Sequence, residues 1–425
     1  MYNAAFRPFI AKTCRRIVLT LKFFHTFAAM KRNPLYIIIY VALLAGFCSC
    51  REKTSPDPNG KWATQDSTEN TAIVYMIGEE SGLSVSLESD IQEMADGKDS
   101  IPENGRIVVY IDKANQPPVI YQIDAKHGKQ VWKTYEEDED CTDSLTMLRN
   151  LKRIMECFPA RHYGLTISAH GTGWLAKNRV KRKALGYDTT NGTKWVNIPT
   201  LRGILEQLPH TRYILFDACF MQSVEVAYEL HDVTDWIIGS PAEIPGTGAP
   251  FHLITKAMVD GDVEAITERY RSYYPHGYFL GVVLSAVRCD KMEQLAEATK
   301  RHIVEKFADR HDVEKTYNIQ KYSSWPAPFT YCYDINSMMY NILGEDEYAE
   351  WAETFVQAVP LRAMSDGSWT SYYCDENWVS DPEHYGGISM FIPESSTTES
   401  ITEENMGDLR KLRWYKAAGW DTTGW

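Results

Sequence analysis

Two apolar segments of this 425-residue chain end on residues that could carry out nucleophilic catalysis together. One segment ends on Asp217 and Cys219, and another, 49 residues upstream, ends on His170 and Gly171. A thiolate attacks carbonyl carbon well, but only a few per cent of a free thiol is ionised at neutral pH. A neighbouring imidazole can activate the thiol and later protonate a leaving amine. The pair therefore suggests a cysteine peptidase.

Each of these residues also has a structural interpretation, because a cysteine within an apolar strand is commonly a small buried hydrophobic residue. A histidine at a strand end commonly makes only a hydrogen bond. In an open parallel sheet, however, ligands and chemistry gather outside the carboxyl ends of the strands. Two strand ends that carry Cys219 and His170 therefore favour the catalytic interpretation. Gly171 leaves its backbone bare, so its N–H could join that of Cys219 in binding an oxyanion.

The elements that must position these residues alternate between strands and helices. Strands are expected over 72–77, 106–111, 165–171, 213–219, 236–239 and 281–287, and a hairpin over 119–133. Helices are expected over 84–96, 143–155, 197–208, 223–231, 291–310, 335–343 and 347–364, and two further helices are expected over 251–274. This order predicts an α/β fold with a mainly parallel sheet and helices on both faces. Ser223 is expected to cap the helix after Cys219, whose positive end would lower the pKa of the thiol.

The pattern loosens after residue 311, where the strands and helices stop alternating. We expect an N-terminal extension with a signal peptide over 1–49 and a linker over 50–70. A catalytic domain is expected over 71–311. A smaller C-terminal subdomain, with an isolated strand at 387–392, is expected over 312–425.

The residues before position 50 indicate export. Lys31 and Arg32 precede an uninterrupted apolar run of 13 residues, which ends at Cys48-Ser49-Cys50 before a polar linker. This run has the length of a signal-peptide core and is too short for a transmembrane helix, which needs about 20 residues. A small residue before a cysteine resembles a bacterial lipoprotein processing site, so Cys50 is the expected lipidation site. A lipid anchor would place the protein in the bacterial cell envelope, at the outer membrane or cell surface. A plain secretory signal is the alternative.

Charge and cysteine usage limit the function classes. Removal of residues 1–49 takes away seven basic and no acidic residues, which leaves 37 Lys/Arg against 57 Asp/Glu, a net charge of −20. Such a surface argues against nucleic-acid binding and weakly attracts cationic substrates. No C-x-x-C pair occurs, which argues against a zinc site. The remaining cysteines are expected to be buried free thiols, with some disulfide pairing as the alternative.

Longer blocks around the two candidate residues resemble the clostripain family of cysteine peptidases, which belongs to the caspase-like clan. The similar blocks lie at 169–174, 186–190, 216–230 and 386–393, and the resemblance spans about residues 71–425. It implies a caspase-like sheet fold and a His170–Cys219 dyad. It also implies cleavage after Arg or Lys, with Asp217 as the acidic residue that binds the P1 side chain. We expect a monomer that acts on peptides and proteins.

Asp217 fits that specificity role, because a carboxylate beside the nucleophile could pair with a guanidinium or an ammonium group. Capping the next helix or orienting a loop is the alternative. A second acid would be expected in the loop over 240–250, but neither Glu243 nor Thr247 aligns as one. A broader basic preference is therefore expected in place of strict Arg selectivity.

Two charged segments lie outside the catalytic blocks. Family members are often activated by cleavage between His and Cys, and the loop there holds basic residues that match the expected preference: Arg179, Lys181, Arg182 and Lys183. Self-cleavage at this loop is one hypothesis, and an ordinary solvated basic loop is the other. The acidic run 136–140 could hold calcium, which some relatives use, but it lacks the glycine and ligand spacing of a calcium loop. We therefore expect no cofactor and no metal.

Taken together, these features predict an exported, lipid-anchored cysteine endopeptidase that cleaves after basic residues. Two other functions use the same scaffold and stay open at this point. One is a catalytically silent surface-binding protein, and the other is a transpeptidase that forms the same acyl-enzyme.

Overall fold

The computed structural model describes residues 62–78, 81–175, 184–190, 194–274, 281–313, 317–322, 333–365, 382–393 and 403–425. All of them belong to one compact unit, Trp62–Trp425. The predicted export signal, the lipidation site Cys50 and the basic loop at 179–183 lie outside the described residues. Among the described residues, no helix has the length and apolar character needed to cross a membrane.

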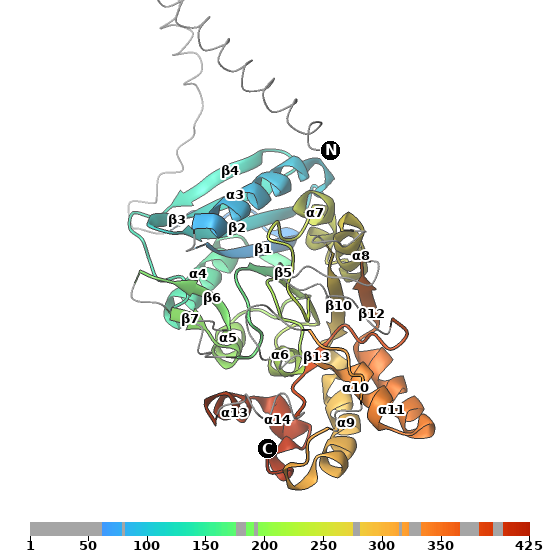
Figure 1. Ribbon diagram of the computed structural model, residues 1–425. Helices are drawn as coiled ribbons and strands as arrows, with labels where there is room; N and C mark the ends of the chain where they lie inside the picture. Colours follow the sequence, from blue (N-terminus) through green and yellow to red (C-terminus); the bar gives the residue numbers. More distant parts are fainter. Residues whose placement is uncertain are drawn as a thin grey trace, which may run out of the picture. The chain divides into compact units, whose positions relative to one another are not determined.

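A nine-stranded sheet runs through the described part of the chain in the order β12-β10-β9-β8-β5-β1-β2-β3-β4 (Figure 1). Its strands are β1 (Thr68–Gly78), β2 (Gly105–Lys113), β3 (Gln116–Asp124), β4 (Gly128–Thr134), β5 (Ala160–Ser168), β8 (Ile214–Asp217), β9 (Trp236–Gly239), β10 (Val283–Arg288) and β12 (Leu361–Met364). The five central strands, from β9 to β2, pair in parallel. The outer strands add antiparallel pairs at both edges. The predicted α/β class with a mainly parallel sheet is confirmed.

Helices cover both faces of this sheet. They are α3 (Ser81–Asp96), α4 (Ser144–Cys157), α5 (Ile198–Leu205), α6 (Val224–Leu230), α7 (Phe251–Asp260), α8 (Val263–Tyr273), α9 (Met292–Lys306), α10 (Ile335–Ile342), α11 (Glu345–Ala358), α13 (Glu403–Leu409) and α14 (Arg413–Ala417). One core contains residues of α3, α7 and α8, and the other contains residues of α4, α5, α6 and α9. Successive residues of β1 enter opposite cores, Val74 on the first and Tyr75 on the second. Burial on both sides explains why these strands are apolar throughout.

Two predicted helix starts are found with their caps. The Asp143 carboxylate accepts a hydrogen bond from Thr146 N at 3.1 Å, and Ser223 Oγ accepts one from Val226 N at 3.2 Å. Each cap satisfies a backbone N–H that has no partner inside its helix. The helices after β4 and after the Cys219 segment therefore begin where the sequence predicts.

The secondary structure of two segments was predicted wrongly. The helix expected over 347–364 ends at Ala358, and Leu361–Met364 forms β12, which pairs antiparallel with β10. Pro360 explains the break, since proline lacks an N–H and disfavours helical geometry in the residue before it. The segment between the strand expected at 165–171 and the helix expected at 197–208 was assigned no strand, but it contains a hairpin of β6 (Leu185–Asp188) and β7 (Lys194–Val196).

The strand expected at 387–392 is paired. It contains β13 (Ser389–Met390), which pairs antiparallel with β11 (Tyr333–Asp334). The C-terminal residues Trp414 and Trp420 share one core with residues of α6 and α9. The domain boundaries given above stay predictions.

Candidate active site

The parallel pairing of β5 with β8 brings the two candidate residues to one edge of the sheet. Ser168 and Asp217 are paired partners at the ends of these strands, and His170 and Cys219 each follow two residues later. A Cβ atom added to Gly171 would lie 2.4 Å from the carbonyl oxygen of Cys219. Such a contact is too short for any side chain, so glycine permits the close approach of these two strand ends.

The backbone around His170 is held by the strand β6. Gly186 N donates to His170 O at 2.7 Å, and Thr172 N donates to Ala184 O at 2.9 Å. Because these bonds flank the bridge between Gly171 and residue 185, the N–H of Gly171 points away from β6. The exposed imidazole of His170 stacks on Tyr187, with ring centroids 6.1 Å apart and planes 4° from parallel.

The thiol of Cys219 is partly buried and lies against the segment that follows β9. Ile244 N donates to Cys219 Sγ at 3.5 Å, and Phe220 N donates to Ala242 O at 2.9 Å. A backbone donor to sulfur favours the thiolate. The sequence predicted that the positive end of the next helix would act on the Cys219 thiol. However, α6 begins only at Val224, and a helix dipole acts mainly within its first turn, so the helix end lies farther along the chain than expected. Sequence reasoning missed Ile244, because a backbone N–H carries no residue-type signal.

The residue after the thiol has an unusual backbone conformation. Phe220 has φ 61°, in the left-handed region that costs a residue other than glycine about 1–3 kcal/mol. Gly173 packs on it, since a Cβ added there would lie 2.8 Å from Phe220 O. The hydrogen bond to Ala242 and the buried Phe220 ring hold this turn in place. The turn redirects the chain directly after Cys219.

The block at 386–393 connects the two candidate catalytic blocks. Ser389 N donates to Gln222 O at 3.0 Å, and Phe391 N donates to Glu225 Oε1 at 2.7 Å. The Phe391 ring also meets Trp174, from the histidine block, edge to face at 6.3 Å between centroids. This C-terminal block therefore braces the cysteine block and the histidine block against each other.

Asp217 is buried and orients a loop. Its carboxylate is 5% exposed and accepts hydrogen bonds from Ser168 Oγ at 3.0 Å, Ala249 N at 2.9 Å and Tyr270 OH at 3.3 Å. Burial raises the pKa of Asp217 to about 6. The bond from Ala249 gives Asp217 the loop-orienting role that the sequence left open.

A second buried acid, Asp90 on α3, was missed by sequence reasoning. It is 3% exposed, and burial, followed by the charges of Asp217 and Glu93, raises its pKa to about 9. A signal was present, because Asp90 interrupts the apolar stripe formed by Leu87, Ile91 and Met94 on that helix. An acid in the buried stripe of an amphipathic helix is out of place unless something requires it.

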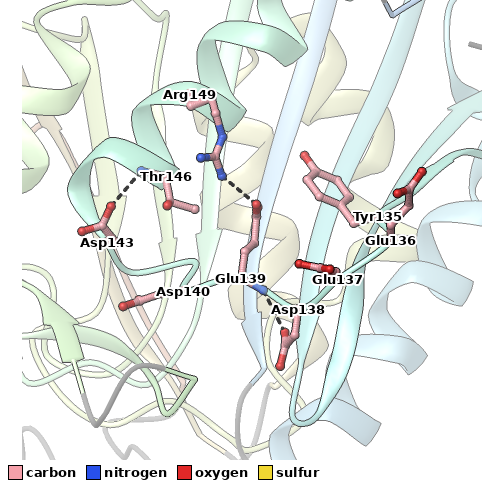
Figure 2. A pocket seen from close by; sticks show the side chains of 9 residues that line it. All are labelled: Tyr135, Glu136, Glu137, Asp138, Glu139, Asp140, Asp143, Thr146 and Arg149. Atoms are coloured by element: carbon pink, nitrogen blue, oxygen red, sulfur yellow. Dashed lines mark hydrogen bonds and ion pairs between the residues drawn. The ribbon is translucent and has the colours of Figure 1, made fainter. Parts of the chain in front are cut away.

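The acidic run lies in a cavity elsewhere. The cavity, of about 710 Å³, is lined by Tyr135, Glu136, Glu137, Asp138, Glu139, Asp140, Asp143, Thr146 and Arg149, and the candidate catalytic residues are not among them (Figure 2). Glu139 already pairs with Arg149 at 2.6 Å and accepts from Tyr110 OH at 3.0 Å. Asp140 accepts from Thr142 Oγ1 at 2.9 Å. The expectation that no calcium is held there stays a prediction.

Three buried groups have a spacing that could suit a metal ion. Asp112, Cys141 and Asp188 each place one ligand atom within 4.8 Å of the others. Burial raises the pKa of Cys141 well above its usual value, so its thiol keeps its proton and can donate to the carboxylates. Asp188 also accepts from Cys141 N at 2.6 Å and Thr190 N at 2.8 Å. These hydrogen bonds hold Asp188 within the cluster, and the expectation that no metal binds stays a prediction.

The described cysteines match the sequence expectation for thiols. Cys141, Cys157 and Cys289 are free thiols and are buried, and the Cys219 side chain is not in a disulfide and is partly exposed. Of these four, Cys219 is the one that a substrate could reach.

We expect the buried acids to make the fold less stable as pH rises from about 4 to about 9. Burial raises the folded-state pKa of Glu225 to about 7, while an unfolded glutamate titrates at about 4.3. Between these values the folded state binds more protons, so the free energy of unfolding falls with rising pH. Asp217 and Asp90 act in the same direction.

Urea unfolding of the wild type and of Glu225→Gln across this pH range checks the expectation. Glutamine removes the titration and keeps the acceptor for Phe391 N, so the variant should lose less stability between about pH 4.5 and 7. The exposed Asp96→Asn on α3 serves as the control and should follow the wild type. A Glu225→Gln profile parallel to the wild type over that range would contradict the assignment.

Comparison with known proteins places the chain in a family. A model of the clostripain family matches residues 74–425. A secreted C11 cysteine protease from Bacteroides thetaiotaomicron, solved with an irreversible peptide inhibitor, is 29% identical with a TM-score of 0.71, over 83% of this chain and 100% of that chain. An inactive zymogen C11 protease from Parabacteroides distasonis is 23% identical with a TM-score of 0.71, over 84% and 99% of the two chains.

A search of curated proteins found no significant match. The family match covers most of the chain, including the described residues of both candidate catalytic blocks and of the C-terminal block. The solved C11 proteases share its sheet fold. The chain therefore belongs to the clostripain family of cysteine-type peptidases, as its sequence blocks implied.

Proposed function

We propose that this peptidase is an exported endopeptidase that cleaves after basic residues, with Cys219 as nucleophile and His170 as its proton-transfer partner. The register of β5 and β8 carries the proposal, because it sets both residues at one sheet edge with Gly171 against Cys219. Membership in a peptidase family favours this function over a silent binding scaffold.

The arrangement suits a two-step acyl transfer. The Cys219 thiolate forms a bond to the scissile carbonyl carbon, and the carbonyl electrons move to oxygen, where the N–H groups of Gly171 and Cys219 stabilise them. His170 then protonates the leaving amine as the C–N bond breaks, which leaves a thioester. In the second step, water loses a proton to His170 and attacks the thioester, and the C–S bond breaks to release the acid.

The preference for basic residues rests on the charge beside the nucleophile. Asp217 is a buried carboxyl two residues before Cys219, where a P1 lysine or arginine would place its cationic group. The acidic composition of the chain adds a weak long-range attraction for such substrates.

Covalent labelling tests the dyad. A peptidyl acyloxymethyl ketone with lysine at P1 should label the wild type, and Cys219→Ala should take no label. His170→Ala should react at least about 100-fold more slowly, because proton transfer supplies a factor of that size. Cys157→Ala, which removes a different free thiol, is the control and should label normally. Label on Cys219→Ala would refute the nucleophile, and equal rates for probes with P1 lysine and P1 glutamine would refute the basic preference.

We also propose that the peptidase activates itself by cleavage in the basic loop between the two catalytic blocks. The loop holds Arg179, Lys181, Arg182 and Lys183, which match the proposed P1 preference. The P. distasonis relative is described as an inactive zymogen, which supports an activation step in this family.

Electrophoresis of purified chains tests self-activation. The wild type should yield two fragments, while Cys219→Ala stays intact. A chain with these four loop residues and the neighbouring Lys177 changed to glutamine should also stay intact, although its thiol is unchanged. An uncut wild-type chain with full peptidase activity would rule the step out.

For the location of the peptidase, we propose a lipid anchor at Cys50 in the cell envelope. The basic pair and apolar run before it support this anchor, and a B. thetaiotaomicron relative is described as secreted. In a bacterial host, the wild type should sediment with membranes and incorporate labelled palmitate, and Cys50→Ser should do neither. Cys48→Ser is the matched control and should behave as the wild type. Unlabelled wild type in the soluble fraction would refute the anchor.

A further inference from the structure

Two buried carboxyl groups, one of them two residues before Cys219, have no cationic partner among the described residues. Asp217 and Asp90 are 5% and 3% exposed, and their charges interact. In the part of the chain that the structure describes, no lysine, arginine or histidine forms an ion pair with either of them. Burial of unpaired charge is costly, and buried acids near a nucleophile commonly mark a binding site.

Asp217 alone has too few acceptor positions for a basic side chain. A carboxylate offers about four lone-pair positions, and Ser168, Ala249 and Tyr270 already use three of them. The backbone at Gly248 also crowds Oδ2, since a Cβ added there would lie 2.9 Å away. An ammonium has three donors and a guanidinium has five, so neither would be satisfied by Asp217.

Asp90 has the acceptors that Asp217 lacks. No hydrogen bond reaches its carboxyl group from any described residue. Its helix, α3, lies beside α7 (Figure 1), and the ion pair between Glu93 and His252, at 3.0 Å, joins the two helices. Leu87 and Ile91 of α3 share a core with Ala249, which is the residue that Asp217 holds.

We propose that Asp90 is a second acidic residue of the pocket for the P1 side chain, and that a lysine or arginine cation binds between Asp90 and Asp217. This inference rests on the proposed endopeptidase function. The second acid expected in the 240–250 loop is then supplied by α3. Carboxylates on two separate elements accept either an ammonium or a guanidinium, which agrees with a broad basic preference.

The charged groups around Asp90 determine how the preference for a basic P1 residue should change with pH. Glu93 on α3 and Asp217 on β8 repel a charge on Asp90. Tyr270 on α8 and Tyr274 directly after it stay neutral, because burial raises their pKa values. On α7, His252 pairs with Glu93. Asp90 therefore keeps its proton in the empty pocket, and an entering cation must displace it. The advantage of a basic P1 residue over a neutral one should increase from about pH 6 to pH 9.

Steady-state kinetics on peptides that differ only at P1 tests the proposal. For Asp90→Asn, the ratio of kcat/KM for P1 lysine over P1 glutamine should fall about 10- to 100-fold, the size of one lost charged hydrogen bond. The same variant should unfold at a temperature equal to or higher than that of the wild type, because it removes a buried ionisable group and breaks no hydrogen bond to a described residue. Asp90→Glu keeps the charge and should retain the preference. Asp96→Asn, on the exposed face of the same helix, is the control and should keep both ratio and stability.

The outcomes separate this proposal from the function on which it rests. An unchanged P1 ratio in Asp90→Asn, or an equal loss for lysine and glutamine substrates, would overturn the role of Asp90 and leave the peptidase assignment intact. A wild-type chain that hydrolyses none of the peptides would overturn the proposed function, and this inference with it. Asp217→Asn is a poorer probe, because it also disturbs the loop held at Ala249.

Discussion

The register between β5 and β8 is the constraint on which the rest of the site depends. Ser168 pairs with Asp217, and the same two residues are joined again by a side-chain hydrogen bond of 3.0 Å. A slip of one residue would turn each side chain to the other face of the sheet. Both strands lie in the middle of the sheet with a core on each face, so such a slip would send each apolar side chain into the wrong core and disrupt the packing of both. The positions of His170 and Cys219 are therefore fixed by the hydrophobic cores.

The site collects groups that a fold selected for stability alone would avoid. Glu225, Asp217 and Asp90 are acids buried deeply enough to raise their pKa values, and Phe220 holds a strained backbone conformation. Each one lowers the free energy of unfolding at neutral pH. The paired strands and the two cores offset these costs, which is the common arrangement at functional sites.

The sequence predicted those parts of the fold and of the candidate site that depend on residues close together in the chain. The apolar strands, the caps at Asp143 and Ser223, and the strand ends with His170 and Cys219 follow from residues near in sequence. It did not predict the Ile244 contact to sulfur, because the residues involved are 25 positions apart and the donor is backbone. Two signals present in the sequence were missed. Pro360 indicates the end of a helix, and Asp90 is an acid within an apolar helix stripe.

The hydrogen bond from Phe391 N to Glu225 spans 166 residues of sequence, and it joins a C-terminal segment to the helix that follows Cys219. Contacts of such separation form late in folding, because closing a long loop costs entropy that only the assembled core repays. A chain still emerging from the ribosome carries the thiol, but not the C-terminal block that contacts both the cysteine and histidine blocks. The order of synthesis thus delays assembly of the site until the C-terminal block has been made.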